Sequence, residues 1–400
     1  MRGRISILAV TLLVAGCQSQ TPSGSASPSS TASETQSAAP SVAASATDPG
    51  PAAWSETGSF NDTGGFSLVI DIAQNGTVVV AVGTQYVAPI PNFGFPPDHD
   101  GRLWISEDGY TWSDAAPAGV FDGVSLNQVL ATPAGGFVAF GFGPAQRAWG
   151  SADGETWTEI PSPFPANSTV TSLASGAQGY LTLVDGPARQ LWFSGDGAAW
   201  AATYALADQA VSIGAGDEGF AVAGTANPGT AQAAPFGIAS SDGSGWVPAA
   251  TPPSVASGAV HVAPHAGDWY AMANGDLTAT TPVSFSANGL DWAQSGSMPL
   301  AEVQADATTT CREFVTALHG STPWLVATSR LSFPCSEGGF VVHGTQRAST
   351  DGTTWTDLPF AAGTPGQTGS GSAVFATVMV NGRLVLAGQS NSAATFWIGE

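Results

Sequence analysis

The chain of 400 residues has no lysine and few charged side chains of any kind, which make up 10% of it. Its nine basic residues are arginines, set against 30 aspartates and glutamates, and the formal net charge is −21 at pH 7. Because nucleic acids and anionic lipid headgroups repel such an acidic surface, neither is expected as a partner. The negative charge does not identify a partner, since acidic exteriors also keep exported proteins soluble.

Long apolar runs are missing after the N-terminus, where none approaches the roughly 20 residues of a membrane-spanning helix. The N-terminus itself has Arg2 and Arg4, an apolar run over 5–15 and then Gly16-Cys17, the pattern of an export signal. Residues 13–17 resemble a bacterial lipobox, which implies cleavage before Cys17 and acylation of that residue. We therefore expect a protein held by lipid on Cys17 at the outer side of the cell membrane. A cysteine lying by chance near an ordinary cleavage site is the alternative, and it explains less of the pattern.

Aromatic residues are absent between residues 17 and 52, where Ser, Thr, Ala and Pro predominate. Such a segment cannot bury a core and is predicted to be a disordered tether. The expected division is a signal peptide over 1–16, a tether over 17–52 and a folded part over 53–400. The folded part is long for a single ordinary core, but repeat architectures escape that limit.

The folded part contains one phrase six times, Ser-x-Asp-Gly-x-x-Trp, with Asn in place of Asp in the fifth copy. Successive copies lie about 45 residues apart, with one longer interval before the last, and this period suits four-stranded propeller blades. The Asp-Gly pair predicts a two-residue type I′ turn between the third and fourth strands. The Trp is expected to pack between neighbouring blades. The six copies are Ser106–Trp112, Ser151–Trp157, Ser194–Trp200, Ser240–Trp246, Ser286–Trp292 and Ser349–Trp355.

This phrase resembles the Asp-box, or bacterial neuraminidase repeat, of sialidase-like propellers, although it is one residue shorter. The resemblance implies an all-β propeller in which the repeat is structural and takes no part in catalysis. Calcium is not expected at these turns, because each offers one carboxylate where calcium takes about six to eight oxygens. The turn residues with this structural role are Asp108, Asp153, Asp196, Asp242, Asn288 and Asp351.

The two ends of the folded part predict the number of blades. After the last phrase three strands follow, near 373–379, 382–388 and 394–399, and a fourth is missing. Residues 53–57 resemble the outer strand at 156–160 and precede the first inner strand. We therefore predict an all-β, seven-bladed β-propeller of four-stranded antiparallel blades, in which the N-terminal strand closes the last blade.

The connections between the second and third strands are long in three blades, over 84–101, 225–236 and 331–346. Long loops on a rigid scaffold are the usual place for recognition. The first of them could stack on a sugar or hold a metal, or it could fold over the propeller as a plug. Its candidate residues are Tyr86, Phe93, Phe95, Asp98, His99 and Asp100.

Two cysteines, Cys311 and Cys335, fall in the blade with the largest insertion. Export to an oxidising compartment favours a disulfide between them. Two free buried thiols are the alternative. His261 and His265 flank a strand, where a spacing of four does not give the metal pair that it gives on a helix. Neither a metal nor a cofactor is expected.

Four arginines each stand just before the third strand of a blade: Arg102, Arg147, Arg189 and Arg347. A cluster of them could bind a carboxylate bidentately. Each could instead pair with a local Asp or Glu, and the sequence leaves both alternatives open.

Three functions fit this sequence. The favoured one is a non-catalytic binding or scaffolding module for a glycan, an envelope polymer or a protein partner, expected to be a monomer. The resemblance also allows a sialidase-like glycoside hydrolase, but the Arg-Ile-Pro element of that family is absent and no catalytic set is recognisable. An assembly factor for a membrane complex is the third. Since a propeller fold hosts unrelated functions, the fold does not choose among them.

Overall fold

The computed structural model describes residues 54–60, 66–86, 99–207, 209–253, 259–273, 279–304, 310–331, 344–358, 373–390 and 392–399. The chain divides into a unit over 1–46 and a unit over 47–400, and all described residues belong to the second. Among them, no helix is long and apolar enough to cross a membrane. The described part of the second unit is built from β-strands.

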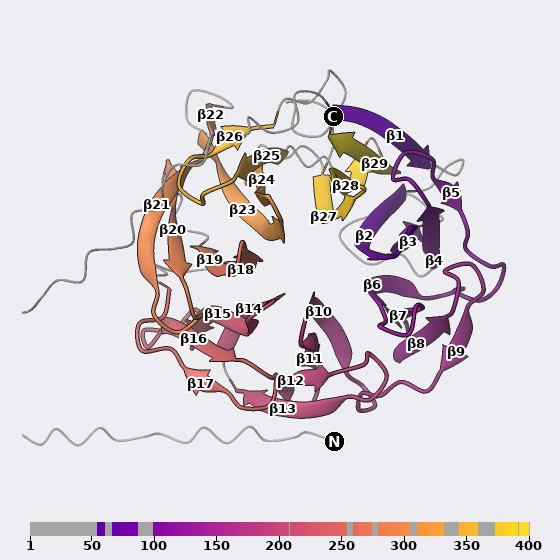
Figure 1. Ribbon diagram of the computed structural model, residues 1–400, viewed down its shortest axis with the longest axis horizontal. Coiled ribbons are helices and arrows are strands. Elements are labelled where there is room, and N and C mark those ends of the chain that lie inside the picture. The colour runs from indigo at the N-terminus through magenta and orange to yellow at the C-terminus, as the bar shows by residue number, and fades with distance from the viewer. Residues whose placement is uncertain are drawn as a thin grey trace, which may run out of the picture. The chain divides into compact units, whose positions relative to one another are not determined.

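Seven antiparallel sheets stand around a common axis, with one edge strand of each sheet nearest the centre (Figure 1). Blades 1 to 3 consist of β2 (Phe66–Asn75), β3 (Val78–Tyr86), β4 (His99–Ser106), β5 (Ser113–Asp114); β6 (Ser125–Ala131), β7 (Phe137–Phe142), β8 (Gln146–Ser151), β9 (Thr158–Ile160); β10 (Thr169–Gly176), β11 (Gly179–Asp185), β12 (Arg189–Ser194) and β13 (Ala201–Leu206). Blades 4 and 5 consist of β14 (Gln209–Gly216), β15 (Gly219–Ala226), β16 (Ala234–Ser240), β17 (Val247–Pro248); β18 (Val260–His265), β19 (Asp268–Ala273), β20 (Thr280–Ser286) and β21 (Ala293–Pro299). Blades 6 and 7 consist of β22 (Glu302–Gln304), β23 (Thr310–Ser321), β24 (Trp324–Leu331), β25 (Gly344–Ser349), β26 (Thr356–Asp357); β27 (Ala373–Val380), β28 (Arg383–Ser390), β29 (Ala393–Gly399) and β1 (Trp54–Phe60).

The N-terminal strand β1 closes the ring. It pairs antiparallel with β29, from Trp54 opposite Gly399 to Phe60 opposite Ala394, and so becomes the outer strand of blade 7. The predicted seven-bladed propeller and its closure are thereby confirmed. Blade 6 departs from the prediction of four strands, because the short strand β22 adds to the start of β23 as a fifth.

The Ser-Asp-Gly phrases form six equivalent loops between the third and fourth strands of their blades. In the first, Ser106 Oγ accepts the N–H of Gly109 at 2.8 Å, and Asp108 Oδ1 accepts the N–H groups of Tyr110 and Thr111 at 2.8 and 2.7 Å. The predicted type I′ turn is wrong, because the glycine has a positive φ while the preceding aspartate does not. The serine and aspartate side chains accept the N–H groups of the loop. The third and fourth strands can therefore stop pairing before the loop, and no tight two-residue turn is required.

The glycine of each loop has a second role. Gly243 has φ +74°, and a Cβ there would collide with the ring of Phe193 in the preceding blade. Gly352 stands in the same way against Tyr270. The left-handed conformation and the contact with the neighbouring blade both favour glycine at these positions.

The core consists of seven apolar clusters, one in each interface between neighbouring blades. At the junction of blades 1 and 7, the ring of Trp112 stacks on Phe396 with centroids 3.8 Å apart and 8° between the planes. The tryptophans of the repeated phrase thus pack between blades, as the sequence predicted. Stability therefore depends on contacts between blades more than on any single sheet.

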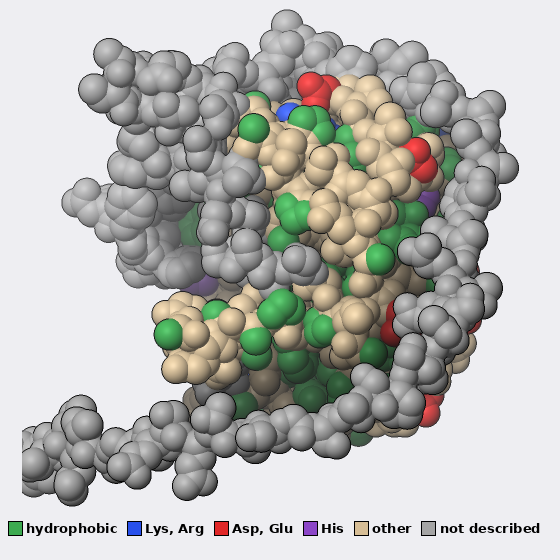
Figure 2. Space-filling model, turned by 90° about the vertical axis from the view of Figure 1, so that its left-hand side faces the viewer, with side chains coloured by type: hydrophobic (Ala, Val, Ile, Leu, Met, Phe, Trp, Pro, Cys, Tyr) green, Lys and Arg blue, Asp and Glu red, His purple; other side chains and the backbone are tan. Residues whose placement is uncertain are grey.

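The outer surface is sparsely charged. From one side, Figure 2 shows mainly uncharged side chains and backbone, with acidic side chains separate from one another. The large exposed apolar side chains among the described residues, Phe142, Val247 and Phe375, belong to blades 2, 4 and 7. Being on different blades, these three side chains form no joint apolar patch.

Candidate functional site

The described part of the first long loop lies where β3 ends and β4 begins. Tyr86 is opposite His99 in the strand pair, with ring centroids 6.1 Å apart, and its ring is buried. The carboxylate of Asp100 accepts the N–H of Gly123 at 3.0 Å, which joins the loop to the connection leading into blade 2. Phe93, Phe95 and Asp98 lie outside the described residues, as do Cys17, Cys335 and the side chain of Cys311, so these predictions stay predictions.

Each of the four singled-out arginines pairs with an acidic residue of its own blade, and Arg189 also donates to the backbone carbonyl of Gln209 in blade 4 at 2.6 Å. Arg147 forms a two-point ion pair with Glu159, at 2.9 and 2.6 Å, and its guanidinium lies 4.9 Å from the ring centroid of Trp149. The hydrogen bonds of this pair raise the pKa of Arg147 and lower the pKa of Glu159. Arg189 pairs with Asp185 of the same blade, with one N–O distance of 2.9 Å.

The other two arginines also pair with acidic residues of their own blades. Arg102 hydrogen-bonds Gln85 and lies 3.7 Å from the carboxylate of Asp114. Arg347 is buried and lies 2.8 Å from the carboxylates of both Glu313 and Asp357. Burial pushes the pKa of Glu313 upward, but the charge of Arg347 and the N–H of Ala301 hold it below its ordinary value. The structure therefore favours local pairing and does not bring the four guanidinium groups together.

The two histidines of blade 5 lie at its interface with blade 6. His265 Nε2 lies 3.0 Å from the carbonyl oxygen of Thr350 in blade 6. Burial lowers the pKa of His261 to about 4, against a hydrogen bond with the backbone of Val315 that acts in the opposite direction. Burial and the nearby His261 together lower the pKa of His319 to about 4. Within the described ranges, no three His, Cys, Asp or Glu side chains group as a metal site would require.

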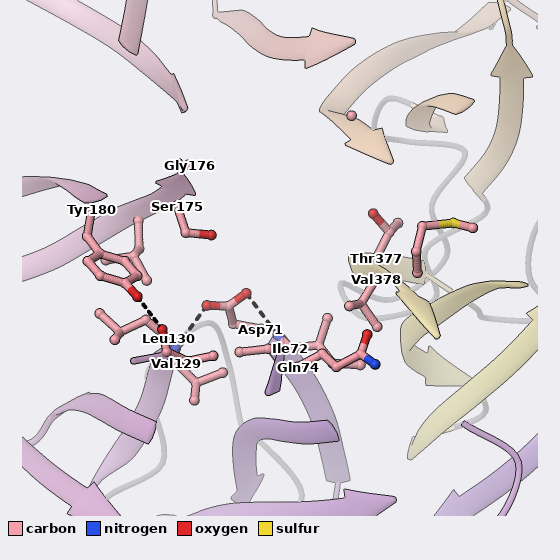
Figure 3. Close-up of a pocket in the computed structure, with 15 residues that line it drawn as sticks. Asp71, Ile72, Gln74, Val129, Leu130, Ser175, Gly176, Tyr180, Thr377 and Val378 are labelled. Atoms are coloured by element: carbon pink, nitrogen blue, oxygen red, sulfur yellow. Dashed lines mark hydrogen bonds between the residues drawn. The ribbon is translucent and has the colours of Figure 1, made fainter. Parts of the chain in front are cut away.

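An axial cavity of about 590 Å³ is the site that the sequence did not indicate. It opens where the inner strands approach their turns into the second strands, and blades 1, 2, 3, 6 and 7 contribute to it (Figure 3). Its described lining consists of Asp71, Ile72, Ala73, Gln74, Val129, Leu130, Ala131, Leu173, Ser175, Gly176, Tyr180, Gly320, Thr377, Val378 and Met379. A volume of this size falls within the range of ligand-binding pockets.

Asp71 is the charged residue in that described lining. It follows a bulge in β2, where the register shifts between Val69 and Asp71. One carboxylate oxygen accepts the N–H of Ile72 at 2.8 Å and the other accepts the N–H of Val129, in blade 2, at 2.9 Å. Burial raises the pKa of Asp71 to about 7, although both hydrogen bonds act to lower it. Withdrawal from water thus outweighs two good acceptor contacts.

A second hollow of about 330 Å³ continues from the axial cavity and shares Ser175, Gly176 and Gly320 with it. The turns of blades 4 and 5 supply its acidic residues Asp217, Glu218 and Asp268. The sequence held a weak signal for this region. Asp71 interrupts an otherwise largely apolar inner strand, but nothing in the strand alternation shows that it faces an axial opening.

These sheets, their closure and the axial cavity define a seven-bladed β-propeller with an opening of ligand-binding size. No protein-family profile and no curated protein matches the chain. Among solved structures it is similar to YCF48 bound to D1 peptide, with a TM-score of 0.52 and 13% identity, covering 86% of this chain and 96% of that one. It is also similar to YCF48 from Cyanidioschyzon merolae (TM-score 0.49, 16% identity, 87% and 99% covered) and to a chain in the mitotic checkpoint complex (0.49, 12%, 89% and 95%). Such low identity shows the fold alone, and the Asp-box resemblance stays a prediction.

Proposed function

We propose that this protein is a non-catalytic propeller, anchored by lipid on Cys17 outside the cytoplasm, that binds a segment of a partner protein in its axial cavity. The observation that carries the proposal is the cavity itself, because residues from five blades meet there around about 590 Å³. A site formed by several blades exists only in the closed ring. Binding there requires no group beyond those that line the cavity.

Two further observations support a protein ligand over an acidic sugar. The guanidinium groups that could have held a sugar carboxylate are each paired with an acid or amide of their own blade. YCF48, a solved protein with the same fold, is bound to D1 peptide, so this architecture can hold a peptide. The lining of the cavity offers hydroxyl, amide and carboxylate groups beside aliphatic walls, which suits an extended chain.

The test is site-specific photo-cross-linking of the full-length chain in its own cells. A photoreactive residue at Gln74, in the cavity, should give a discrete adduct with a protein, because the partner lies against it. The same residue at the exposed Val247, on the outer strand of blade 4, is the matched control and should give none. A Cys17→Ser chain should leave the membrane fraction. The proposal is wrong if the Gln74 chain forms no adduct, or if the Val247 chain forms the same one.

A further inference from the structure

Among the described residues, charge is distributed unequally between the two faces of the propeller. In up-and-down blades, the turn from first to second strand and the loop from third to fourth strand emerge on the same side, here called the turn face. Acidic residues of the turn face are Glu107, Asp108, Asp153, Glu155, Asp196, Asp217, Glu218, Asp242, Asp268, Asp291 and Asp351. Within the described ranges, the arginine on these turns is Arg383, whose guanidinium lies 5.1 Å from the ring centroid of Tyr110.

The remaining described arginines are positioned toward the opposite face. They stand at the starts of third strands, at the start of β23 and at the end of β24: Arg102, Arg147, Arg189, Arg312, Arg330 and Arg347. The side chains described in detail there are paired with acids, whereas the turn face has acids in excess. An excess of one sign around an opening concentrates its field in that opening.

The aspartates of the repeated loops keep their charge. Hydrogen bonds from the backbone N–H groups of Thr156 and Glu155 lower the pKa of Asp153 to about 2. The same arrangement lowers the pKa of Asp108, Asp196 and Asp242. The turn face is therefore negative throughout the physiological pH range.

The axial cavity opens on this negative face and has the groups that a cationic side chain needs. Asp71 supplies a carboxylate, and Tyr180 donates its own hydroxyl hydrogen to the carbonyl of Ala131, which leaves the hydroxyl oxygen as an acceptor (Figure 3). Leu130 and Met379 supply aliphatic wall, against which the methylene groups of a long cationic side chain can pack. The continuing hollow adds Asp217, Glu218 and Asp268 along the approach.

We propose that the axial cavity takes the side chain of an arginine or lysine from an extended segment of the partner protein, with Asp71 as its counter-ion. The inference rests on the proposed function and specifies the ligand of the same site. An incoming cation also offsets the unfavourable burial of the Asp71 carboxylate, so the bound state favours the ionised form that the empty site disfavours. The acids of the turn face steer the basic segment toward the opening.

The experiment presents detergent-solubilised full-length protein to four immobilised heptapeptide pools. The pools share random flanking positions and differ in a fixed central residue, which is arginine, lysine, citrulline or glutamate. Citrulline has the shape of arginine without its charge. The arginine and lysine pools should retain the protein, and the citrulline and glutamate pools should not. Equal retention by all four pools, or retention by none, would overturn the inference.

Variants then locate the site. Asp71→Asn keeps the size of the side chain and removes its charge, and should weaken binding to the arginine pool on the order of tenfold or more. Asp122→Asn removes the same charge on the opposite face and should change binding little. Because Asp71→Asn also alters a contact with blade 2, its melting temperature is measured, and the rim variant D217N/E218Q/D268N gives an independent reading. Unchanged affinity in both Asp71→Asn and the rim variant would rule out the site.

The two proposals fail in different ways. If Gln74 cross-links a partner but the arginine pool does not retain the protein, the cavity binds a partner by other chemistry. If Gln74 gives no adduct in cells while the arginine pool retains the protein through Asp71, the chemistry of the site stands and its use for a protein partner does not.

Discussion

At the scale of single residues, polar side chains on the inner strands join one blade to the next. Asp71 accepts a backbone N–H of blade 2, and Asn127 of blade 2 donates to the carbonyl of Val170 in blade 3 at 2.6 Å. Ser212 of blade 4 accepts the N–H of Val262 in blade 5 at 3.2 Å. Inner strands have one edge without a strand partner, and these side chains satisfy backbone groups along it.

His261 and His319 lie in the contact between blades 5 and 6, and they make that contact sensitive to acid. Their pKa values, both about 4, lie below the ordinary value near 6.5. Between pH 6.5 and pH 4 these histidines are therefore protonated in the unfolded chain and neutral in the folded one. The contribution of these two histidines to stability should therefore be complete near pH 7 and be lost as the pH drops from 6.5 toward 4. Between pH 7 and pH 5 each histidine should lower the free energy of unfolding by on the order of 1–2 kcal/mol.

The measurement is urea unfolding at several pH values in the wild type, in His319→Gln and in the double variant H261Q/H319Q. The single variant should flatten the pH dependence in part, and the double variant should flatten it further. A double variant with the same loss of stability on acidification as the wild type would show that other groups cause it.

Single residues also show which features the sequence could predict and which it could not. The four arginines were predicted just before the third strands, and they lie within them instead, in β4, β8, β12 and β25, because the third strands begin earlier than the repeat suggested. Their acidic partners come from other strands of the same blade, so the choice between a cluster and local pairing needed three-dimensional positions. Asp71 was missed because its importance depends on an opening that several blades create together.

At the scale of elements, the Ser-Asp-Gly loop recurs with almost the same hydrogen bonds in six blades. Asn288 occupies the aspartate position in blade 5, and its side-chain oxygen accepts the N–H groups of Leu290 and Asp291 at 2.9 Å. The loop thus needs an acceptor oxygen at this position and does not need a charge. This explains how the phrase tolerates asparagine in its fifth copy.

A pair of substitutions in blade 3 tests that reading. Asp196→Ala removes the acceptor of the Ala198 and Ala199 N–H groups and should lower the free energy of unfolding by about 1 kcal/mol. Asp196→Asn should keep most of that stability, as the natural asparagine does in blade 5. Both are measured by denaturant unfolding at neutral pH, and an asparagine variant as unstable as the alanine variant would assign the role to charge.

The structure of these loops also explains why the sequence predicted the wrong turn conformation. The Asp-Gly pair is the usual signal of a two-residue hairpin, and local sequence alone supports that reading. In the structure, Ser106 and Asp108 bond the loop N–H groups, and the Gly109 position packs toward Val385 of the neighbouring blade. The tertiary contact and the side-chain bonds together widen the loop, and neither follows from the dipeptide.

At the scale of the whole molecule, the number of blades and the closure followed from counting strands at the two ends of the repeat. That count needs the period and nothing more, which is why it succeeded. The unequal charge of the described residues on the two faces was not predicted, although each acid and arginine is visible in the sequence. The difference in charge becomes visible only when each turn has been assigned to one of the two faces.

The closing strand should contribute to the stability of the whole ring. Trp54 is 4% exposed and packs in the cluster between blades 6 and 7. Trp54→Ala should therefore lower the free energy of unfolding by about 3 kcal/mol. Trp54→Phe keeps an aromatic ring in the same cluster and should retain much of that energy. Denaturant unfolding followed by circular dichroism measures both, and an alanine variant that unfolds at the wild-type midpoint would show that β1 contributes no closure.

The pairing of β1 with β29 also imposes an order of events on a chain that is synthesised from its N-terminus. The other pairs within the blades join strands that follow one another along the chain, so they can form as the chain lengthens. β1 is made first, and its partner β29 is made after the strands of the other six blades. Until then the growing ring is an open arc, with the contact surfaces of its first and last blades unmet. The ring therefore cannot close before β29 is made, and the first strand of the propeller to be synthesised waits for the last one.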